Sequence, residues 1–177
     1  MKRMVIASVV TMVVVALTAQ AQMPSLPASV SKNLGVYVGT WTGKGKIEVT
    51  PLRSKTEFFT ATISCAWSPN APQVVCEEES GLLAVGTSKG FAVFSYVPQK
   101  KQYQAWISRR KYSRIYYFGT VEGSVWTFGG SFTAAGNTYQ SRMIFNFTSP
   151  KECAQKIEYS EDGKIWSLDA EIKWTKE

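Results

Sequence analysis

Residues 41–49 read WTGKGKIEV and residues 166–175 read WSLDAEIKWT. In both stretches apolar residues or glycines occupy every second position, and charged or hydroxyl side chains fill the positions between them. A period of two places successive side chains on opposite faces of a β-strand, so each stretch predicts a strand with one buried and one solvated face. We expect the inward residues to include Trp41, Ile47, Val49, Trp166, Leu168, Ile172 and Trp174.

Eight further strands are predicted between these two stretches. Their approximate ranges are 57–67, 73–82, 91–97, 102–109, 114–120, 124–132, 138–148 and 153–160. Turn-forming residues separate them, and Asp162-Gly163 before the last strand is a strong hairpin signal. About ten short strands joined mostly by hairpins predict an all-β, antiparallel, up-and-down barrel, because closure removes the exposed edges of such a meander.

The first residues predict export from the cytoplasm. Lys2 and Arg3 precede an apolar run at residues 4–17, and Ala19 and Ala21 occupy the two small-residue positions of a cleavage site. The run is shorter than the roughly 20 apolar residues that a membrane span needs. We therefore predict a signal peptide at residues 1–21, a partly helical lead-in at 22–38, a barrel domain at 39–177, and a periplasmic or secreted location.

Two of the three cysteines are predicted to form a disulfide. If residues 69–72 are a four-residue hairpin loop, Ser68 faces Gln73 and Cys65 lies directly opposite Cys76. Directly opposed residues have Cβ atoms about 4.5–5.5 Å apart, close to what a disulfide requires. An oxidising compartment favours the bond, with two buried thiols as the alternative. Cys153 is then an unpaired thiol, buried or at the rim.

The chain contains no histidine. This excludes Ser-His-Asp and Cys-His catalysis and any zinc site that contains histidine. The densest acidic cluster, Glu77 to Glu79, is expected to be a solvated strand end rather than an acid–base pair or a calcium site. Gly43 and Gly45 lie on a strand, so they are expected to allow close approach of neighbouring groups rather than to bind phosphate. We predict no cofactor, no metal and no enzymatic activity.

Several blocks resemble known proteins. Residues 39–45, GTWTGKG, are similar to the first strand of calycin-like barrels, which include lipocalins and haem-binding nitrobindins. Residues 65–69, CAWSP, and 157–166, IEYSEDGKIW, resemble an uncharacterised family of exported bacterial domains related to those barrels, as do Tyr103 with Trp106 and residues 142–147. The resemblance implies a barrel of about ten strands with an internal cavity, and no established activity. Nitrobindin-like haem binding needs a proximal histidine, so that function is not implied here.

Candidate ligand-binding residues follow from aromatic and polar positions on the predicted strands. They are Trp41, Tyr103, Trp106, Tyr117, Arg142, Asn146 and Trp166. Arg142 shares a strand face with Asn146, whereas Met143 and Phe145 share the other face. If the aromatic face is the core, Arg142 is solvated; if the barrel is wide, Arg142 and Asn146 are polar anchors inside an apolar cavity.

Two surface features suggest contacts with a partner. Arg109, Arg110, Lys111 and Arg114 form the strongest basic cluster, which either binds an anionic envelope surface or keeps one end of the barrel soluble. Residues 91–97 and 115–118 are apolar on both faces, which predicts either a covered outer face or an exposed aromatic patch. The net charge of +7 is mild, and an exported protein rarely meets nucleic acid, so we predict no nucleic-acid partner and a monomer.

The leading hypothesis is an exported protein that binds a small apolar or amphipathic molecule inside the barrel, because barrels of this size can hold one small ligand. One alternative is a structural or interaction module of the cell envelope with a filled barrel. The least favoured is a histidine-free hydrolase or isomerase. A cavity of about 300 Å³ or more with a few converging polar groups would favour binding. A packed interior with an exposed apolar patch would favour the interaction module.

Overall fold

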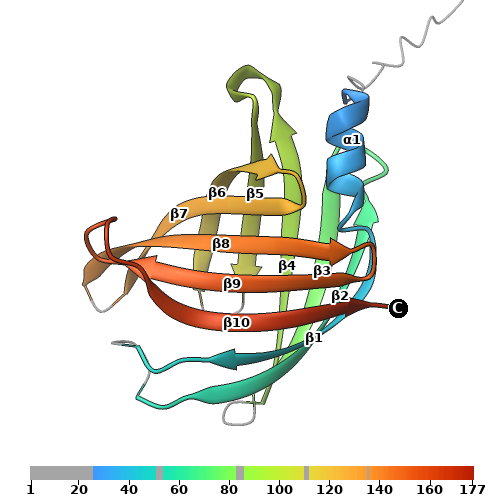
Figure 1. Cartoon of the computed structure of the whole chain (residues 1–177). Coiled ribbons are helices and arrows are strands. Elements are labelled where there is room, and N and C mark those ends of the chain that lie inside the picture. Colours follow the sequence, from blue (N-terminus) through green and yellow to red (C-terminus); the bar gives the residue numbers. More distant parts are fainter. Residues whose placement is uncertain (1–25, 51–53, 83–85, 110–111, 135) are drawn as a thin grey trace, which may run out of the picture.

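The computed structural model describes residues 26–50, 54–82, 86–109, 112–134 and 136–177 (Figure 1). The predicted signal peptide lies outside these residues. Within them, no helix is long and apolar enough to cross a membrane. The elements over the described ranges are α1 (Ala28–Gly35), β1 (Gly39–Ile47), β2 (Glu57–Trp67), β3 (Val74–Leu82), β4 (Gly86–Val97), the 3-10 helix η1 (Pro98–Lys100), β5 (Gln102–Arg109), β6 (Tyr112–Glu122), β7 (Val125–Ala134), β8 (Asn137–Ser149), β9 (Glu152–Ser160) and β10 (Ser167–Lys176).

The strands form one closed barrel (Figure 1). Each strand pairs antiparallel with its neighbours in sequence, and β1 pairs with β10 to close the ring. Closure gives the backbone N–H and C=O groups of the first and last strands a partner strand on each side. The predicted ten-stranded, up-and-down antiparallel barrel with a short N-terminal helix is therefore confirmed.

The hairpin between β2 and β3 has the predicted register. Ser68 N–H donates to the Gln73 carbonyl oxygen at 2.9 Å, and Cys65 lies directly opposite Cys76. The two cysteines form a disulfide across the pair, which confirms the predicted bond. Both sulfurs belong to inward residues, so the bond lies inside the barrel wall and joins neighbouring strands.

A β-bulge in β10 corrects part of the predicted core. The register of β10 on β9 shifts between Leu168 and Ala170, so Ala170 faces Ile157 whereas Leu168 faces Glu158. One extra residue reverses the face of every residue before it. Ile172 and Trp174 are buried as predicted, but the predicted inward placement of Leu168 is wrong.

Two further residues of the predicted core also lie outside it. Trp166 precedes the bulge, and its ring lies 4.2 Å from the Arg142 guanidinium carbon on the outer face of the barrel. Val49 lies beyond the end of β1 and is 58% exposed. Alternation alone placed both inward, because it contains no information on where a strand ends or changes phase.

The IEYSEDGKIW block is the tight connection between β9 and β10. The Asp162 carboxylate accepts the backbone N–H groups of Lys164 and Ile165 at 2.8 and 2.9 Å and the Ser160 hydroxyl at 3.0 Å. Ser160 in turn accepts the Gly163 N–H at 2.9 Å. These hydrogen bonds, led by those from Ile165 and Lys164, lower the pKa of Asp162. The block therefore has a structural role as a turn.

Two glycines of β1 allow large rings to lie against the strand. A Cβ atom on Gly43 would lie 2.5 Å from the Trp174 ring, and one on Gly45 would lie 2.5 Å from the Phe59 ring. Neither position can accept a larger residue unless its neighbour moves. The close approach predicted for these glycines is present, and its partners are Trp174 and Phe59.

The helix α1 covers one end of the barrel (Figure 1). An isolated helix of eight residues is marginal in water, so α1 depends on the packing of its buried Val30 and Leu34 against the barrel core. The Asn33 side-chain amide donates to the Tyr103 hydroxyl at 2.8 Å, which links the helix to β5. Just after the helix, the Tyr37 carbonyl oxygen accepts the Trp41 indole N–H at 2.9 Å.

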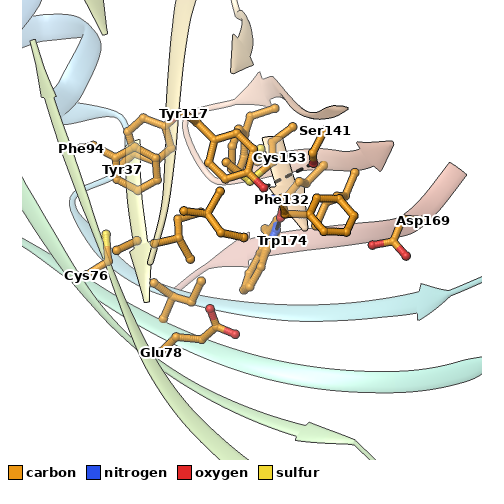
Figure 2. Close-up of a pocket in the computed structure, with 18 of the residues that line it drawn as sticks. Tyr37, Cys76, Glu78, Phe94, Tyr117, Phe132, Ser141, Cys153, Asp169 and Trp174 are labelled. Atoms are coloured by element: carbon orange, nitrogen blue, oxygen red, sulfur yellow. Dashed lines mark hydrogen bonds between the residues drawn. The ribbon is translucent and has the colours of Figure 1, made fainter. Parts of the chain in front are cut away.

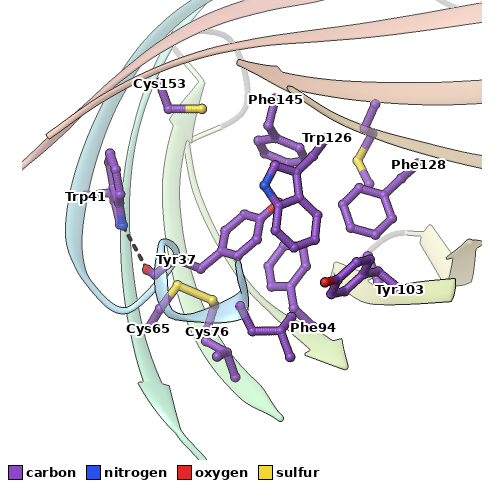
Figure 3. Packing of buried hydrophobic residues seen from close by; sticks show 14 of the residues in the cluster. Tyr37, Trp41, Cys65, Cys76, Phe94, Tyr103, Trp126, Phe128, Phe145 and Cys153 are labelled. Atoms are coloured by element: carbon purple, nitrogen blue, oxygen red, sulfur yellow. Dashed lines mark hydrogen bonds between the residues drawn. A yellow bond between two sulfur atoms is a disulfide. The ribbon is translucent and has the colours of Figure 1, made fainter. Parts of the chain in front are cut away.

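Aromatic rings fill the interior beneath the helix (Figure 3). Tyr37 stacks on Phe94 with ring centroids 4.1 Å apart, and Trp126 and Phe145 contact Tyr37 edge-on at 5.2 and 5.8 Å. Such pairs contribute about 0.5–1.5 kcal/mol each beyond the area they bury. The helix end of the barrel therefore has a packed core.

Candidate functional site in the barrel interior

Beyond the aromatic core the barrel contains a cavity of about 370 Å³ (Figure 2). It extends from Tyr37 beneath α1 to Thr133 and Asp169 at the opposite end of the barrel. Most of its wall is apolar. The apolar lining includes Trp41, Ile63, Ala92, Phe94, Ile107, Ile115, Phe132, Met143, Phe145, Phe147, Ile157 and Trp174, together with the disulfide of Cys65 and Cys76.

A glutamine and a tryptophan form one polar contact of the wall. The Gln155 side chain is buried, and its Oε1 accepts the Trp174 indole N–H at 2.9 Å. An indole nitrogen can only donate, so this contact assigns the oxygen of the Gln155 amide to the Trp174 side. The amide nitrogen of Gln155, with two N–H donors, is on the other side.

A second polar contact joins two hydroxyls. Tyr117 Oη and Ser141 Oγ lie 3.3 Å apart and are both buried (Figure 2). Either hydroxyl can donate the hydrogen of this bond, and the oxygen of the other then accepts it.

Two weakly acidic groups lie at the helix end of the cavity. Burial raises the pKa of the Tyr37 hydroxyl well above its usual value, and the neighbouring Cys153 adds to that rise. Burial also raises the pKa of the Cys153 thiol to about 12, against a smaller lowering by a backbone hydrogen bond from Asn146. Both groups are therefore uncharged at neutral pH, and the Cys153 thiol is not poised as a nucleophile.

Two carboxylates complete the lining, Glu78 from β3 and Asp169 from β10 (Figure 2). Each also interacts with a neighbouring residue. Glu77 and Glu79 lie on the other face of β3 and are exposed, as predicted for a solvated strand end, but Glu78 is half-buried and lines the cavity, which that prediction did not include. The described residues contain no group of three or more His, Cys, Asp or Glu side chains that could hold a metal ion.

The structure brings two of the seven predicted ligand-binding residues to the cavity, Trp41 and Tyr117. Tyr103 is buried but lies in the aromatic core, with its ring 4.6 Å from Trp126, and its hydroxyl bonds Asn33 of the helix. It belongs to the packed end of the barrel and is not among the described lining residues.

The other four predicted residues face away from the cavity. Every second residue of β8 from Ser141 to Phe147 lines the cavity, so Arg142 and Asn146, at the alternate positions, point outward. Arg142 bonds Glu158 and lies over Trp166, and the exposed Asn146 accepts the Ser124 hydroxyl at 3.3 Å. The sequence left open whether Arg142 is solvated or points into the cavity, and in the structure it points outward.

Trp106 lies on an outer aromatic patch with Phe91, Tyr116 and Phe118. Phe91 contacts the Trp106 ring edge-on at 4.7 Å, and Lys100 lies 4.8 Å from the Phe118 ring centroid. Phe91, Tyr116 and Phe118 are exposed, so of the two alternatives for these strands the structure has the exposed patch.

The predicted basic cluster is mostly outside what the structure describes. Arg110 and Lys111 are not described, and the side chains of Arg109 and Arg114 are not described. The strand bounds nevertheless place the end of β5 and the start of β6 at the barrel end opposite α1.

Sequence reasoning missed several lining residues, chiefly Tyr37, Ser141, Cys153 and Gln155. The alternation of the sequence indicates three of them, because residues two positions apart share a strand face. Ser141 shares a face with Met143, and Cys153 and Gln155 share a face with Ile157. Tyr37 precedes the first strand, and no strand pattern could have indicated that it lies inside the barrel.

No family model and no curated protein matches this chain. Two solved structures share its fold at low identity. Rv2717c from M. tuberculosis has a TM-score of 0.61 and 12% identity, over 85% of this chain and 98% of that one. The S-type phycobiliprotein lyase CPES from Guillardia theta has a TM-score of 0.56 and 10% identity, over 84% of this chain and 92% of that one. The chain thus shares the barrel fold of these two structures.

Proposed function

We propose that this chain is an exported binding protein that holds one small apolar or amphipathic molecule inside its barrel. The observation that carries the proposal is the 370 Å³ cavity, with its apolar wall and a few buried polar groups. Ligand sites are commonly about 300–1,000 Å³ and have this mixture of many apolar and few polar lining groups.

The packing of the rest of the barrel supports this proposal. Protein interiors are close-packed and leave few voids larger than a water molecule. Here Leu34, Trp126 and Phe128 meet that standard at the helix end, whereas Ile63, Met143 and Ile157 leave space further along the same barrel. A filled structural barrel has no need of that space.

Export rests on two features of different kinds. The first is the sequence of residues 1–21, with its basic start, apolar run and small-residue cleavage site. The second is the Cys65–Cys76 disulfide, because such bonds persist in oxidising compartments and are rare in the cytosol. A periplasmic or secreted location fits both.

Mass spectrometry of the protein purified from the periplasm tests the proposal directly. We expect the native mass to exceed the denatured mass by one small molecule, present in about one copy per chain. A bare native mass would count against a tightly held ligand.

Binding by an empty cavity is tested with the neutral fluorescent probe N-phenyl-1-naphthylamine. Ile63 lines the cavity, and its neighbour Thr62 points outward and is exposed. Ile63→Trp fills the cavity, so it should weaken probe binding by at least about tenfold, whereas Thr62→Trp should leave it unchanged. Equal affinity for the probe in the unaltered protein and in both variants would mean that the probe binds outside the barrel.

The outer aromatic patch favours a second candidate function, contact with an anionic envelope surface. Exposed Tyr116 lies on β6, just after the basic sequence from Arg109 to Arg114, and exposed Phe91 lies on β4, which pairs with β5. Aromatic and basic side chains together suit a membrane–water interface. Cosedimentation with phosphatidylglycerol vesicles should fall in a Phe91→Ser, Tyr116→Ser double variant; unchanged cosedimentation, or none in the unaltered protein, would reject this candidate.

A further inference from the structure

Gln155 presents hydrogen-bond donors to the cavity that no described residue accepts. Its side chain is 7% exposed and lines the cavity. The bond from the Trp174 indole occupies Oε1, which leaves the Nε2 group, with two N–H donors, on the side away from Trp174. A buried amide rarely leaves its donors unused, because an unmade hydrogen bond in a low-dielectric interior is unfavourable.

Tyr37 supplies a second such donor. Its hydroxyl is buried at the helix end of the cavity and has no hydrogen-bond partner among the described residues. The rings that contact it, including Phe94 and Trp126, offer no lone pair to accept its hydrogen. Because Tyr37 also lines the cavity, an acceptor inside the cavity would satisfy this hydroxyl.

The charge of the wall limits what the acceptor can be. Among the described lining residues there is no Lys or Arg. The donors themselves are uncharged at neutral pH, since burial keeps the Tyr37 hydroxyl protonated. Transfer of a carboxylate or phosphate into such a site loses its hydration without gaining a described counter-charge. A neutral carbonyl oxygen loses far less and accepts the same hydrogen bonds.

We infer that the occupant of the cavity is an uncharged, apolar molecule with a carbonyl-type oxygen, which accepts a hydrogen bond from the Gln155 amide and faces Tyr37 as a second donor. This inference rests on the proposed binding function and narrows its ligand class. The hydrogen bond from Gln155 makes the protein bind such molecules more tightly than hydrocarbons of the same shape.

Three probes of nearly equal shape test the inference: 2-acetylnaphthalene, 2-ethylnaphthalene and 2-naphthoate. Binding is followed through tryptophan emission, since Trp41 and Trp174 line the cavity. One satisfied hydrogen bond should make the ketone bind about three- to tenfold more tightly than the hydrocarbon. The carboxylate should bind more weakly than the ketone.

Gln155→Glu gives the sharpest variant. Glutamate keeps an oxygen for the Trp174 indole and, once ionised, replaces the amide donors with a second acceptor. Affinities are therefore compared at about pH 9.5, where even a buried carboxyl group is ionised. The ratio of ketone to hydrocarbon affinity should fall to about one or below. A merely structural Gln155 would lower both affinities together and leave their ratio unchanged.

A pair of tyrosine variants keeps the inference testable if Gln155→Glu does not fold. Tyr37→Phe removes a hydroxyl without a described partner, so it should fold with an unchanged or higher Tm and a reduced ketone preference. Tyr103→Phe makes the same chemical change in the same core, but breaks the bond from Asn33; its Tm should fall and its ketone preference should stay.

The outcomes separate the inference from the function on which it rests. If none of the three probes binds the unaltered protein, the binding function fails, and the inference fails with it. If all three bind alike, or the carboxylate binds most tightly, the barrel binds apolar molecules but the inferred ligand class is wrong. A ketone preference that survives in both Gln155→Glu and Tyr37→Phe would also overturn it.

Discussion

At the end of the barrel covered by α1, Tyr37, Phe94 and Trp126 fill the interior, and Leu34 of the helix closes it. Beyond these rings, inward positions on the same strands line a cavity that runs from Tyr37 to the opposite end. Both ends are built from the same ten antiparallel strands. The difference lies in the volume of the inward side chains and in the presence of a helix at one end.

This contrast separates stability from binding within one fold. Side chains at the helix end contact other side chains all round, so their loss leaves a void. Side chains at the cavity contact empty space on one side, so the fold depends on them less. Substitutions of equal size should therefore have unequal effects at the two ends.

Phe128 and Phe132, both on β7, provide the most direct test of the contrast. Phe128 is fully buried against Trp126 and does not line the cavity, so Phe128→Ala should lower the free energy of unfolding by about 3–5 kcal/mol. Phe132 lies half-buried at the cavity mouth, so Phe132→Ala should lower it by about 1 kcal/mol. Urea unfolding of both variants measures the difference, and equal losses would show that the two ends are packed alike.

The Cys65–Cys76 disulfide should contribute the next largest effect. It closes a short loop, with a sequence separation of 11, so loss of the cross-link in a Cys65→Ala, Cys76→Ala variant should lower stability by about 2–3 kcal/mol. Cys153→Ala removes a buried thiol without a cross-link and is the control. A larger loss in the control than in the double variant would contradict this ranking.

Alkaline pH should weaken the protein through Cys153. Its pKa is raised to about 12 in the folded state, so the stabilisation from keeping the thiol neutral is complete below its usual pKa, near 8.5, and is lost as pH rises towards 12. Between pH 8 and pH 10 the unaltered protein should lose about 1–2 kcal/mol more than Cys153→Ala does. Parallel curves of unfolding free energy against pH for the two proteins would mean that the Cys153 thiol has the same pKa in the folded and unfolded states.

The smallest effect is expected at the exposed turn between β9 and β10. Backbone hydrogen bonds lower the pKa of Asp162, so its contribution is present above the usual pKa of a carboxyl group and is lost as pH falls through the lowered value. Tm measured from pH 7 to pH 3 should fall more steeply in the unaltered protein than in Asp162→Ala. Glu161→Ala, at the exposed neighbouring position, should follow the unaltered protein.

Much of the fold was predictable because a strand has a simple period. The alternation around Trp41 and Trp174 and the turn signals between strands were sufficient for a barrel, and the loop at residues 69–72 fixed the register of Cys65 on Cys76. These features are local, and each depends on a few consecutive residues.

The site was less predictable because it depends on which face of each strand is inside. In β8 both faces contain plausible ligand contacts, Arg142 on one and Met143 on the other, and only barrel closure decides between them. In β10 the bulge before Ala170 reverses the phase and turns Leu168 outward. The donors of Gln155 become apparent only when Trp174 is seen to hold the amide oxygen.

The pairing of β1 with β10 has a consequence for how the chain acquires its structure. The Thr42 hydroxyl donates to the Thr175 carbonyl oxygen across 133 residues of sequence, so the ring cannot close until the last strand has been made. Contacts this distant in sequence slow folding, and an unpaired strand edge can join another chain in the meantime. Newly made chains are therefore most exposed to misassembly just before Ser167–Lys176 arrives, and the final ten-residue strand sets the moment at which that exposure ends.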